Sequence, residues 1–197
     1  MKTNYILFLG LMGIIGGIIL IGDYATPKQQ PAYEPQDEAV EQPTPMPFYT
    51  YVEMASLEHG VDPALVKAMI LTEVGPTLPR KPVSYNPKDH GMAQINEILF
   101  PQMKEWIGEH FDPYIPEHAV LACIKQIQWL LQRPSINEAN VALAYNMGAT
   151  AVRRGKQPSH ISEKHHQRFH LFLTDIRENP SKYVELFNTV KDWEYGM

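Results

Sequence analysis

The spacing of apolar and polar residues predicts a chain built mainly from helices. Apolar side chains recur every three or four positions in several segments, and no segment of strand length shows strict alternation. Residues 91–96 form a short stretch that suits a turn or a small hairpin. The predicted class is therefore mainly α, with at most a small β-hairpin. Helices are expected at residues 48–59, 62–75, 97–109, 116–132, 135–148, 160–177 and 181–193.

The second of these helices has well-marked ends and carries a carboxylate near its end. Asp62 can cap the start, Pro63 suits the first helical position, and Gly75 favours termination. Apolar residues at helical spacing predict one buried face: Leu65, Val66, Met69 and Ile70. Glu73 lies in the last turn, where the helix dipole and any burial both favour the protonated carboxyl. A carboxyl of this kind can act as a general acid, and the alternative is a solvated residue at a frayed helix end.

The helix predicted at residues 135–148 has a start signal of a different kind. Ser135 followed by Glu138 matches a capping box, in which the two side chains satisfy backbone N–H groups reciprocally. Gly148 marks the other end. The sequence therefore places the first turn of this helix at Ser135.

The amino-terminal part of the chain differs in composition from the predicted helical domain. Residues 5–21 are uncharged and almost wholly apolar, which predicts a transmembrane helix or a signal peptide. The following residues do not resemble a small-residue cleavage site, which favours an uncleaved anchor. Residues 23–47 are rich in proline and acidic side chains, as in an extended tether. We therefore divide the chain into an anchor at residues 1–22, a linker at 23–47 and a helical domain at 48–197.

Composition and charge exclude several classes of function. The formal net charge is −5 and no basic patch interleaves with aromatic residues, so a nucleic-acid partner is not expected. A single cysteine, Cys123, excludes an intramolecular disulfide framework and a cysteine-rich zinc site. Four histidines share one predicted helix without the metalloprotease pattern, so we interpret them as surface or core residues: His160, His165, His166 and His170. Neither a metal nor another cofactor is implied.

Three short segments carry polar residues that a plain helical domain does not need. They are Glu73-Val74-Gly75, Asp89-His90-Gly91-Met92-Ala93-Gln94-Ile95-Asn96 and Ala144-Tyr145-Asn146-Met147-Gly148. Their order and spacing resemble the SLT-type lytic transglycosylase domains of the goose-lysozyme-like group. The resemblance extends over about residues 48–155. It implies a lysozyme-like fold for the domain at residues 48–197.

The resemblance also implies an activity and a set of site residues. Enzymes of this group cleave the β-1,4 bond between N-acetylmuramic acid and N-acetylglucosamine in peptidoglycan, and form a 1,6-anhydro sugar. Glu73 matches the catalytic residue, which acts first as acid and then as base. Tyr145 is expected to hydrogen-bond the Glu73 carboxyl. The residues implied in substrate binding are Gln94, Tyr145, Asn146, Met92 and Gly91.

Two departures from the family pattern keep other functions open. Val74 stands where the family usually has serine, which removes a hydroxyl group beside Glu73. Ala93 stands where methionine is usual, which is expected to widen the floor of the cleft. One alternative is a hydrolytic goose-type lysozyme, for which Asp89 or Glu97 would be the nearest second carboxylate. Another is a wall-binding or assembly protein of the same fold without catalytic turnover.

The expected partners follow from the anchor and the resemblance. Peptidoglycan glycan strands are the expected substrate, and the amino-terminal helix would contact the membrane. Lys2 before the apolar run favours a single-pass protein of the cytoplasmic (inner) membrane, with the domain on the periplasmic or outer side. Wall remodelling, an envelope-spanning secretion complex, and a phage assembly or virion-associated role remain alternative settings.

Overall fold

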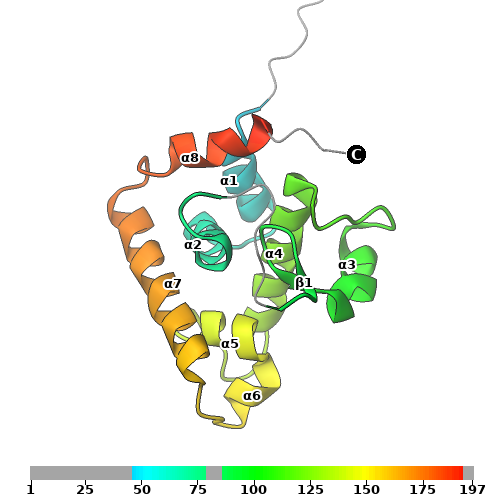
Figure 1. The fold of residues 1–197 in the computed structure, drawn as a ribbon, viewed down its shortest axis with the longest axis vertical. Helices are drawn as coiled ribbons and strands as arrows, with labels where there is room; N and C mark the ends of the chain where they lie inside the picture. Colours follow the sequence, from blue (N-terminus) through cyan, green and yellow to red (C-terminus); the bar gives the residue numbers. More distant parts are fainter. Residues whose placement is uncertain (1–45, 79–85, 193–197) are drawn as a thin grey trace, which may run out of the picture. The chain divides into compact units, whose positions relative to one another are not determined.

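The computed structural model describes residues 46–78 and 86–192, and shows a mainly helical domain with one small sheet (Figure 1). This arrangement confirms the predicted helical class and fits a lysozyme-like fold. The elements are α1 (Phe48–Glu58), α2 (Pro63–Val74), β1 (Asp89–His90), β2 (Ile95–Asn96), the 3₁₀ helix η1 (Glu97–Leu99), α3 (Phe100–Ile107), α4 (Pro116–Leu131), α5 (Val141–Met147), α6 (Ala149–Arg153), α7 (His160–Glu178), α8 (Val184–Asn188) and the 3₁₀ helix η2 (Thr189–Asp192).

Helix α2 is the central helix of the domain (Figure 1). Asp62 Oδ1 accepts a hydrogen bond from the Ala64 N–H at 2.8 Å, and Gly75 ends the helix with φ +82°. Every residue from Ala64 to Thr72 is buried. The sequence pattern predicted one buried face, whereas α2 is enclosed on several sides because α1, α4 and α7 all pack against it. Burial of this kind requires a helix that is apolar nearly all round.

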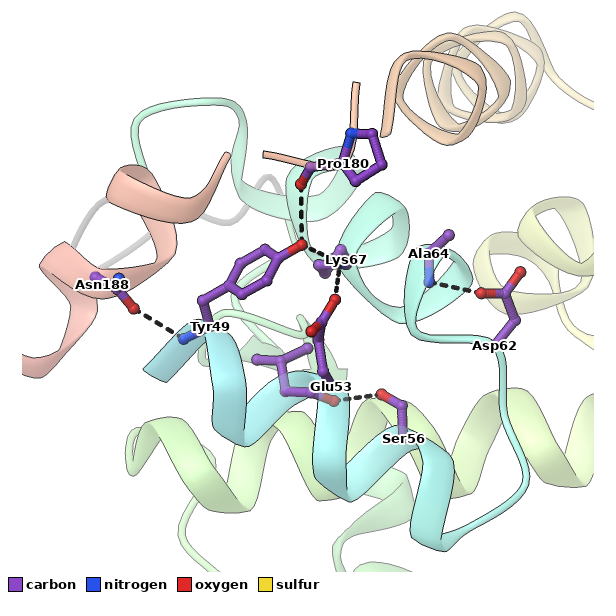
Figure 2. A network of polar contacts seen from close by, with 9 residues as sticks. Tyr49, Glu53, Ser56, Asp62, Ala64, Lys67, Pro180 and Asn188 are labelled. Carbon is purple, nitrogen blue, oxygen red and sulfur yellow. Dashed lines mark hydrogen bonds and ion pairs between the residues drawn. The ribbon is translucent and has the colours of Figure 1, made fainter. Parts of the chain in front are cut away.

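The one buried lysine of α2 organises a polar network at the junction of three segments (Figure 2). Lys67 Nζ lies 3.0 Å from Glu53 Oε1 and donates to the Tyr49 hydroxyl at 2.8 Å. The Tyr49 hydroxyl donates in turn to the Pro180 carbonyl at 2.9 Å, and Asn188 Oδ1 accepts from the Tyr49 N–H at 3.0 Å. The network satisfies a buried charge, as burial requires, and it joins the carboxyl-terminal segment to α1 and α2.

The hairpin expected within residues 91–96 is present and is slightly longer than predicted. β1 and β2 pair antiparallel, with Asp89 opposite Asn96, and Asn96 Nδ2 donates to Asp89 Oδ1 at 2.7 Å. Gly91 begins the turn with φ +70°. A Cβ atom at this position would lie 1.8 Å from the carbonyl oxygen of Pro113, so the close approach of the α3–α4 loop requires glycine here.

The predicted capping box at Ser135 is wrong. Helix α5 begins at Val141, and Ser135 has φ +69°, outside the helical region. Asn140 Nδ2 donates to the Ser135 carbonyl at 2.9 Å and closes this segment as a loop. The Glu138 carboxylate, which would complete the box, is bound by Arg177 at 2.6 Å. A tertiary ion pair therefore replaces the local cap.

The predicted boundaries of α1, α2, α4 and α7 agree with the structure to within about one residue. The segment predicted as one helix at 97–109 is η1 followed by α3, and α6 was not predicted. The pattern over residues 181–193 predicted one helix, and the structure has the short α8 followed by η2. The anchor predicted at residues 1–22 lies outside the described residues, as does the linker up to residue 45. Among the residues that the structure describes, no helix is both long and apolar enough to cross a bilayer.

Candidate active site

Glu73 lies in the last turn of α2, at the boundary between the core and the surface. Its side chain is 12% exposed, so it is neither a solvated helix end nor fully enclosed. Val74 beside it is half-buried and packs against the core. Because Gly75 donates its N–H to the Leu71 carbonyl at 2.9 Å, the end of the helix is fixed and the Glu73 backbone with it. The carboxyl is thus held by a rigid element and remains slightly exposed.

The carboxyl of Glu73 contacts a histidine that is distant in the sequence. His165 Nε2 lies 2.8 Å from Glu73 Oε1, and the two residues are 92 positions apart. Helix α7 brings them together because one face of this helix packs on α2. That face carries His165 together with the buried residues Phe169, Leu173 and Ile176. Its side chain is 7% exposed. The sequence interpretation treated this histidine as an ordinary core or surface residue and missed its contact.

A sequence signal for His165 was present but ambiguous. The spacing of His165, Phe169, Leu173 and Ile176 places all four on one helical face, and the last three are apolar. A histidine at the edge of an apolar stripe must find a partner when it is buried. The spacing can indicate burial, but it does not identify Glu73 as the partner.

Arg168 secures the same end of α2, one turn further along α7. Its guanidinium donates to the Thr72 carbonyl, one of the carbonyl groups that a helix end leaves without an intrahelical partner. A cation at this position also complements the negative end of the helix dipole. The last turn of α2 is therefore held both at its backbone and at the Glu73 side chain.

Tyr145 on α5 is close to Glu73 but donates its proton elsewhere. Its hydroxyl donates to the Ala93 carbonyl at 2.8 Å, so the hydrogen bond expected to the Glu73 carboxyl is not formed. Burial raises the pKa of Tyr145 well above its ordinary value, and the neighbouring Cys123 thiol and Glu73 carboxyl raise it further. Tyr145 thus ties α5 to the hairpin beside Glu73 as a neutral phenol.

A groove of about 610 Å³ adjoins Tyr145. It lies between η1, α4, α5 and α6, and Trp129 and Arg154 line it together with Tyr145. The Arg133 guanidinium lies over the Trp129 ring, 3.9 Å from its centroid. Trp129 is half-buried, packs on the core and lines the groove. A groove that combines an aromatic side chain with a few polar ones is typical of a ligand site. Glu73 is not among the residues that line it.

The model of the transglycosylase SLT domain family matches residues 50–167. The chain belongs to this family. The match includes Glu73, the hairpin, Tyr145 and His165, and ends one residue before Arg168. Neither a search of curated proteins nor a search of solved structures found a match.

The SLT domain places the residues predicted to bind substrate in different surroundings. Gln94 is half-buried and its Nε2 donates to the Gly91 carbonyl at 2.8 Å, so its amide braces the hairpin turn. Met92 is 1% exposed and lies in the core beneath the turn. Asn146 is exposed at the end of α5, beside Tyr145. Of these residues, Tyr145 alone is among those that line the groove, whereas Met92 and Gly91 are buried at the hairpin turn.

The structure also shows the surroundings of Ala93, where the chain departs from the family pattern, and of the two candidate second carboxylates. Ala93 is fully buried, so its small side chain faces the core rather than the expected cleft floor, and its carbonyl receives the Tyr145 proton. The two candidate second carboxylates are engaged at the hairpin. Asp89 accepts from Asn96, and the exposed Glu97 lies 3.5 Å from Lys88 Nζ.

Proposed function

We propose that this SLT domain is a peptidoglycan lytic transglycosylase in which Glu73 acts as acid and then as base. Membership of the SLT family supports peptidoglycan cleavage of the lytic transglycosylase type. The observation that carries the specific role is the position of Glu73: a carboxyl that is 12% exposed, fixed at the end of the central helix and next to Tyr145. A positioned carboxyl in a partly desolvated site suits proton transfer to a substrate oxygen.

The reaction can be written with one carboxyl group. Protonated Glu73 donates its proton to the glycosidic oxygen, and the bond from that oxygen to C1 of the muramic acid breaks with its electron pair on the oxygen. The 6-hydroxyl oxygen of the same sugar forms a new bond to C1. Its proton passes to the Glu73 carboxylate, which returns to the acid form. No water is consumed, and the intramolecular nucleophile has a large advantage in effective concentration.

The groove beside Tyr145 is the proposed place for the glycan strand. Trp129 offers an apolar surface for a sugar ring, while the exposed Asn146, next to Tyr145 in α5 but outside the groove lining, offers a polar contact beyond the groove. Gln94 acts through the hairpin turn that it braces, and Gly91 and Met92 keep that turn packed beneath the site. Glu73 is not among the residues that line the groove, but Tyr145 lines it and neighbours Glu73. In this proposal the glycan strand continues from the groove past Tyr145, and the anhydro sugar forms at Glu73.

The decisive experiment is digestion of purified peptidoglycan with mass analysis of the products. The wild-type domain should release muropeptides with 1,6-anhydro ends. Glu73→Gln removes the acidic proton with little change in shape, and should lower the rate by about 10²–10⁴-fold. Circular dichroism should show that the variant is folded. Full activity of folded Glu73→Gln would contradict the proposal.

The same assay separates the alternatives. Glu97→Gln is a matched control because it removes an exposed carboxylate near the site, and the transglycosylase should tolerate it. Reducing-end sugars in place of anhydro ends, together with loss of activity in Glu97→Gln, would indicate a hydrolase with two carboxylates. Binding to wall sacculi without any soluble product would indicate a non-catalytic wall-binding protein.

A further inference from the structure

The Glu73–His165 pair is a buried contact between two titratable groups, and the single-carboxyl reaction does not by itself require it. Glu73 Oε1 and His165 Nε2 are 2.8 Å apart, and the side chains are 12% and 7% exposed. Within the described part of the chain, the other imidazole nitrogen, Nδ1, is buried without a hydrogen-bond partner. These facts restrict where the protons of the pair can be.

The unpartnered Nδ1 favours a neutral imidazole with its proton on Nε2. A cationic ring would bury a charged N–H group without an acceptor, which is the most costly arrangement. A neutral ring with the proton on Nδ1 would also bury an unpaired donor. The remaining form leaves only a lone pair unsatisfied, and buried acceptors without partners are better tolerated than buried donors. In this form His165 Nε2–H donates to Glu73 Oε1.

In the described part of the chain, the other hydrogen-bond donors around the pair do not serve the Glu73 carboxyl, so His165 is its donor. On α5, the Tyr145 hydroxyl proton is used by the Ala93 carbonyl, and on α4 the Cys123 thiol is buried. On α7 itself, Arg168 donates to the Thr72 carbonyl of α2. His166, the adjacent ring, stacks edge-on with His170 at 4.5 Å between centroids. Glu163 and Lys164 on the same helix are exposed.

We propose that His165 is a positioning residue for Glu73, which donates Nε2–H to Oε1 and leaves Oε2 to exchange protons with the substrate. This inference rests on the proposed function. With Oε1 occupied by a donor, the acidic proton of Glu73 belongs on Oε2. After that proton leaves, the same hydrogen bond stabilises the carboxylate until the 6-hydroxyl proton arrives. His165 itself neither gains nor loses a proton in the cycle.

Two amide substitutions test whether an N–H donor is needed at the position of His165 Nε2. His165→Gln places an amide nitrogen near the position of Nε2, whereas His165→Asn has the same amide group on a side chain one methylene shorter. His165→Asn should lower kcat by about 10- to 100-fold, as expected for a lost hydrogen bond to a charged group, with little change in KM. His165→Gln should restore most of the rate. His160→Gln, at an exposed histidine of the same helix, is the matched control and should behave as wild type.

The pH profile distinguishes positioning from a general loss of structure. Without the donor the carboxylate is less stable relative to the acid, so the alkaline limb of kcat/KM against pH should move to higher pH in His165→Asn. It should stay in place in His165→Gln. Folded His165→Asn with the wild-type rate and profile would overturn the proposal. So would His165→Gln with the same defect and profile as His165→Asn.

A measurement that does not depend on enzymatic activity tests this inference separately from the proposed function. The ¹⁵N shifts of the His165 ring, assigned by their loss in His165→Gln, should show a neutral imidazole protonated at Nε2. A ring protonated at Nδ1, or at both nitrogens, would overturn the inference even if the enzyme is active and even if His165→Asn does not fold. If the wild-type protein releases no wall fragments, the proposed function fails, and the ring shifts still decide the state of the pair.

Discussion

Gly91 shows how one residue can fix the geometry beside a site. Its backbone has φ +70°, and its α-carbon faces the Pro113 carbonyl so closely that a Cβ atom would lie 1.8 Å from the oxygen. Its own carbonyl accepts from the Gln94 amide. The turn that presents Gln94 and the Ala93 carbonyl therefore depends on the absence of a side chain at Gly91.

Gly91→Ala should be much more destabilising than the same change at a glycine with free space. Gly60 has a similar φ of +67°, but nothing lies within 4 Å of its Cβ position. Gly60→Ala should lower the free energy of unfolding by about 1–2 kcal/mol, the cost of a left-handed conformation. Gly91→Ala must also displace backbone, and should lose at least about 3 kcal/mol. Denaturant unfolding measures both values, and equal losses would contradict the proposed close approach.

Helix α7 is the element that completes the site and holds the domain together. It packs on α2 and α5, contributes His165, and continues beyond the end of the family match to Glu178. Near its end Arg177 lies 2.6 Å from both Asp62 and Glu138. Asp62 is the residue that caps α2, so this ion-pair cluster joins the end of α7 to the start of the helix that carries Glu73.

The Arg177 cluster should contribute a small stability that is lost in acid. The hydrogen bond from Arg177 lowers the pKa of Glu138 from its ordinary value of 4.5. A carboxyl whose pKa is lower in the folded state stabilises the protein above the unfolded pKa, and this contribution is lost as the pH falls through the folded value. Because these side chains are 41–48% exposed, Arg177→Met should cost only about 0.5–1 kcal/mol at pH 7.

Unfolding experiments on Arg177→Met at several pH values measure this contribution. The difference from wild type should be complete at pH 7 and should shrink as the pH falls below about 4.5, where Glu138 becomes protonated in the unfolded chain. Lys164→Met, at an exposed lysine of the same helix, is the matched control. A difference that is constant from pH 7 to acid would contradict the role of the ion pair.

At the scale of the whole domain, one continuous core lies beneath the site. Buried side chains from α1, α2, α4, α5 and α7 form a single cluster, and Cys123 of α4 lies within it at 0% exposure. Burial raises the pKa of the Cys123 thiol well above its ordinary range. A thiol that is both protonated and enclosed is unreactive. Since it is the only cysteine of the chain, it reports on the opening of this core.

Cys123 should react with a thiol reagent only when the domain unfolds. In native buffer at pH 8 the reaction should be slower by about 10³-fold or more than in denaturant, because exposure requires an opening close to global unfolding. The rate should rise with urea along the same slope as the unfolding equilibrium. Rapid modification in native buffer would show that the core opens locally around α4.

The sequence by itself determined the features that depend on neighbouring residues. Asp62, Pro63 and Gly75 mark the ends of α2 through capping and backbone preference, and the structure has that helix with those ends. The hairpin was predicted from its short polar segment and is present. The family was predicted from three motifs in order, and the family match confirms it. Each of these signals is local because a cap, a turn or a motif acts through residues a few positions apart.

The tertiary structure alone decided which distant groups meet at the site. Periodicity can show that His165 lies on an apolar face, but the packing of α7 on α2 selects Glu73 as its partner. The Tyr145 proton goes to the Ala93 carbonyl instead of Glu73, and Arg177 removes Glu138 from its predicted cap. A hydrogen bond depends on distances within a few tenths of an ångström. Residue spacing fixes which face a side chain occupies, and only the packing of whole elements sets such distances.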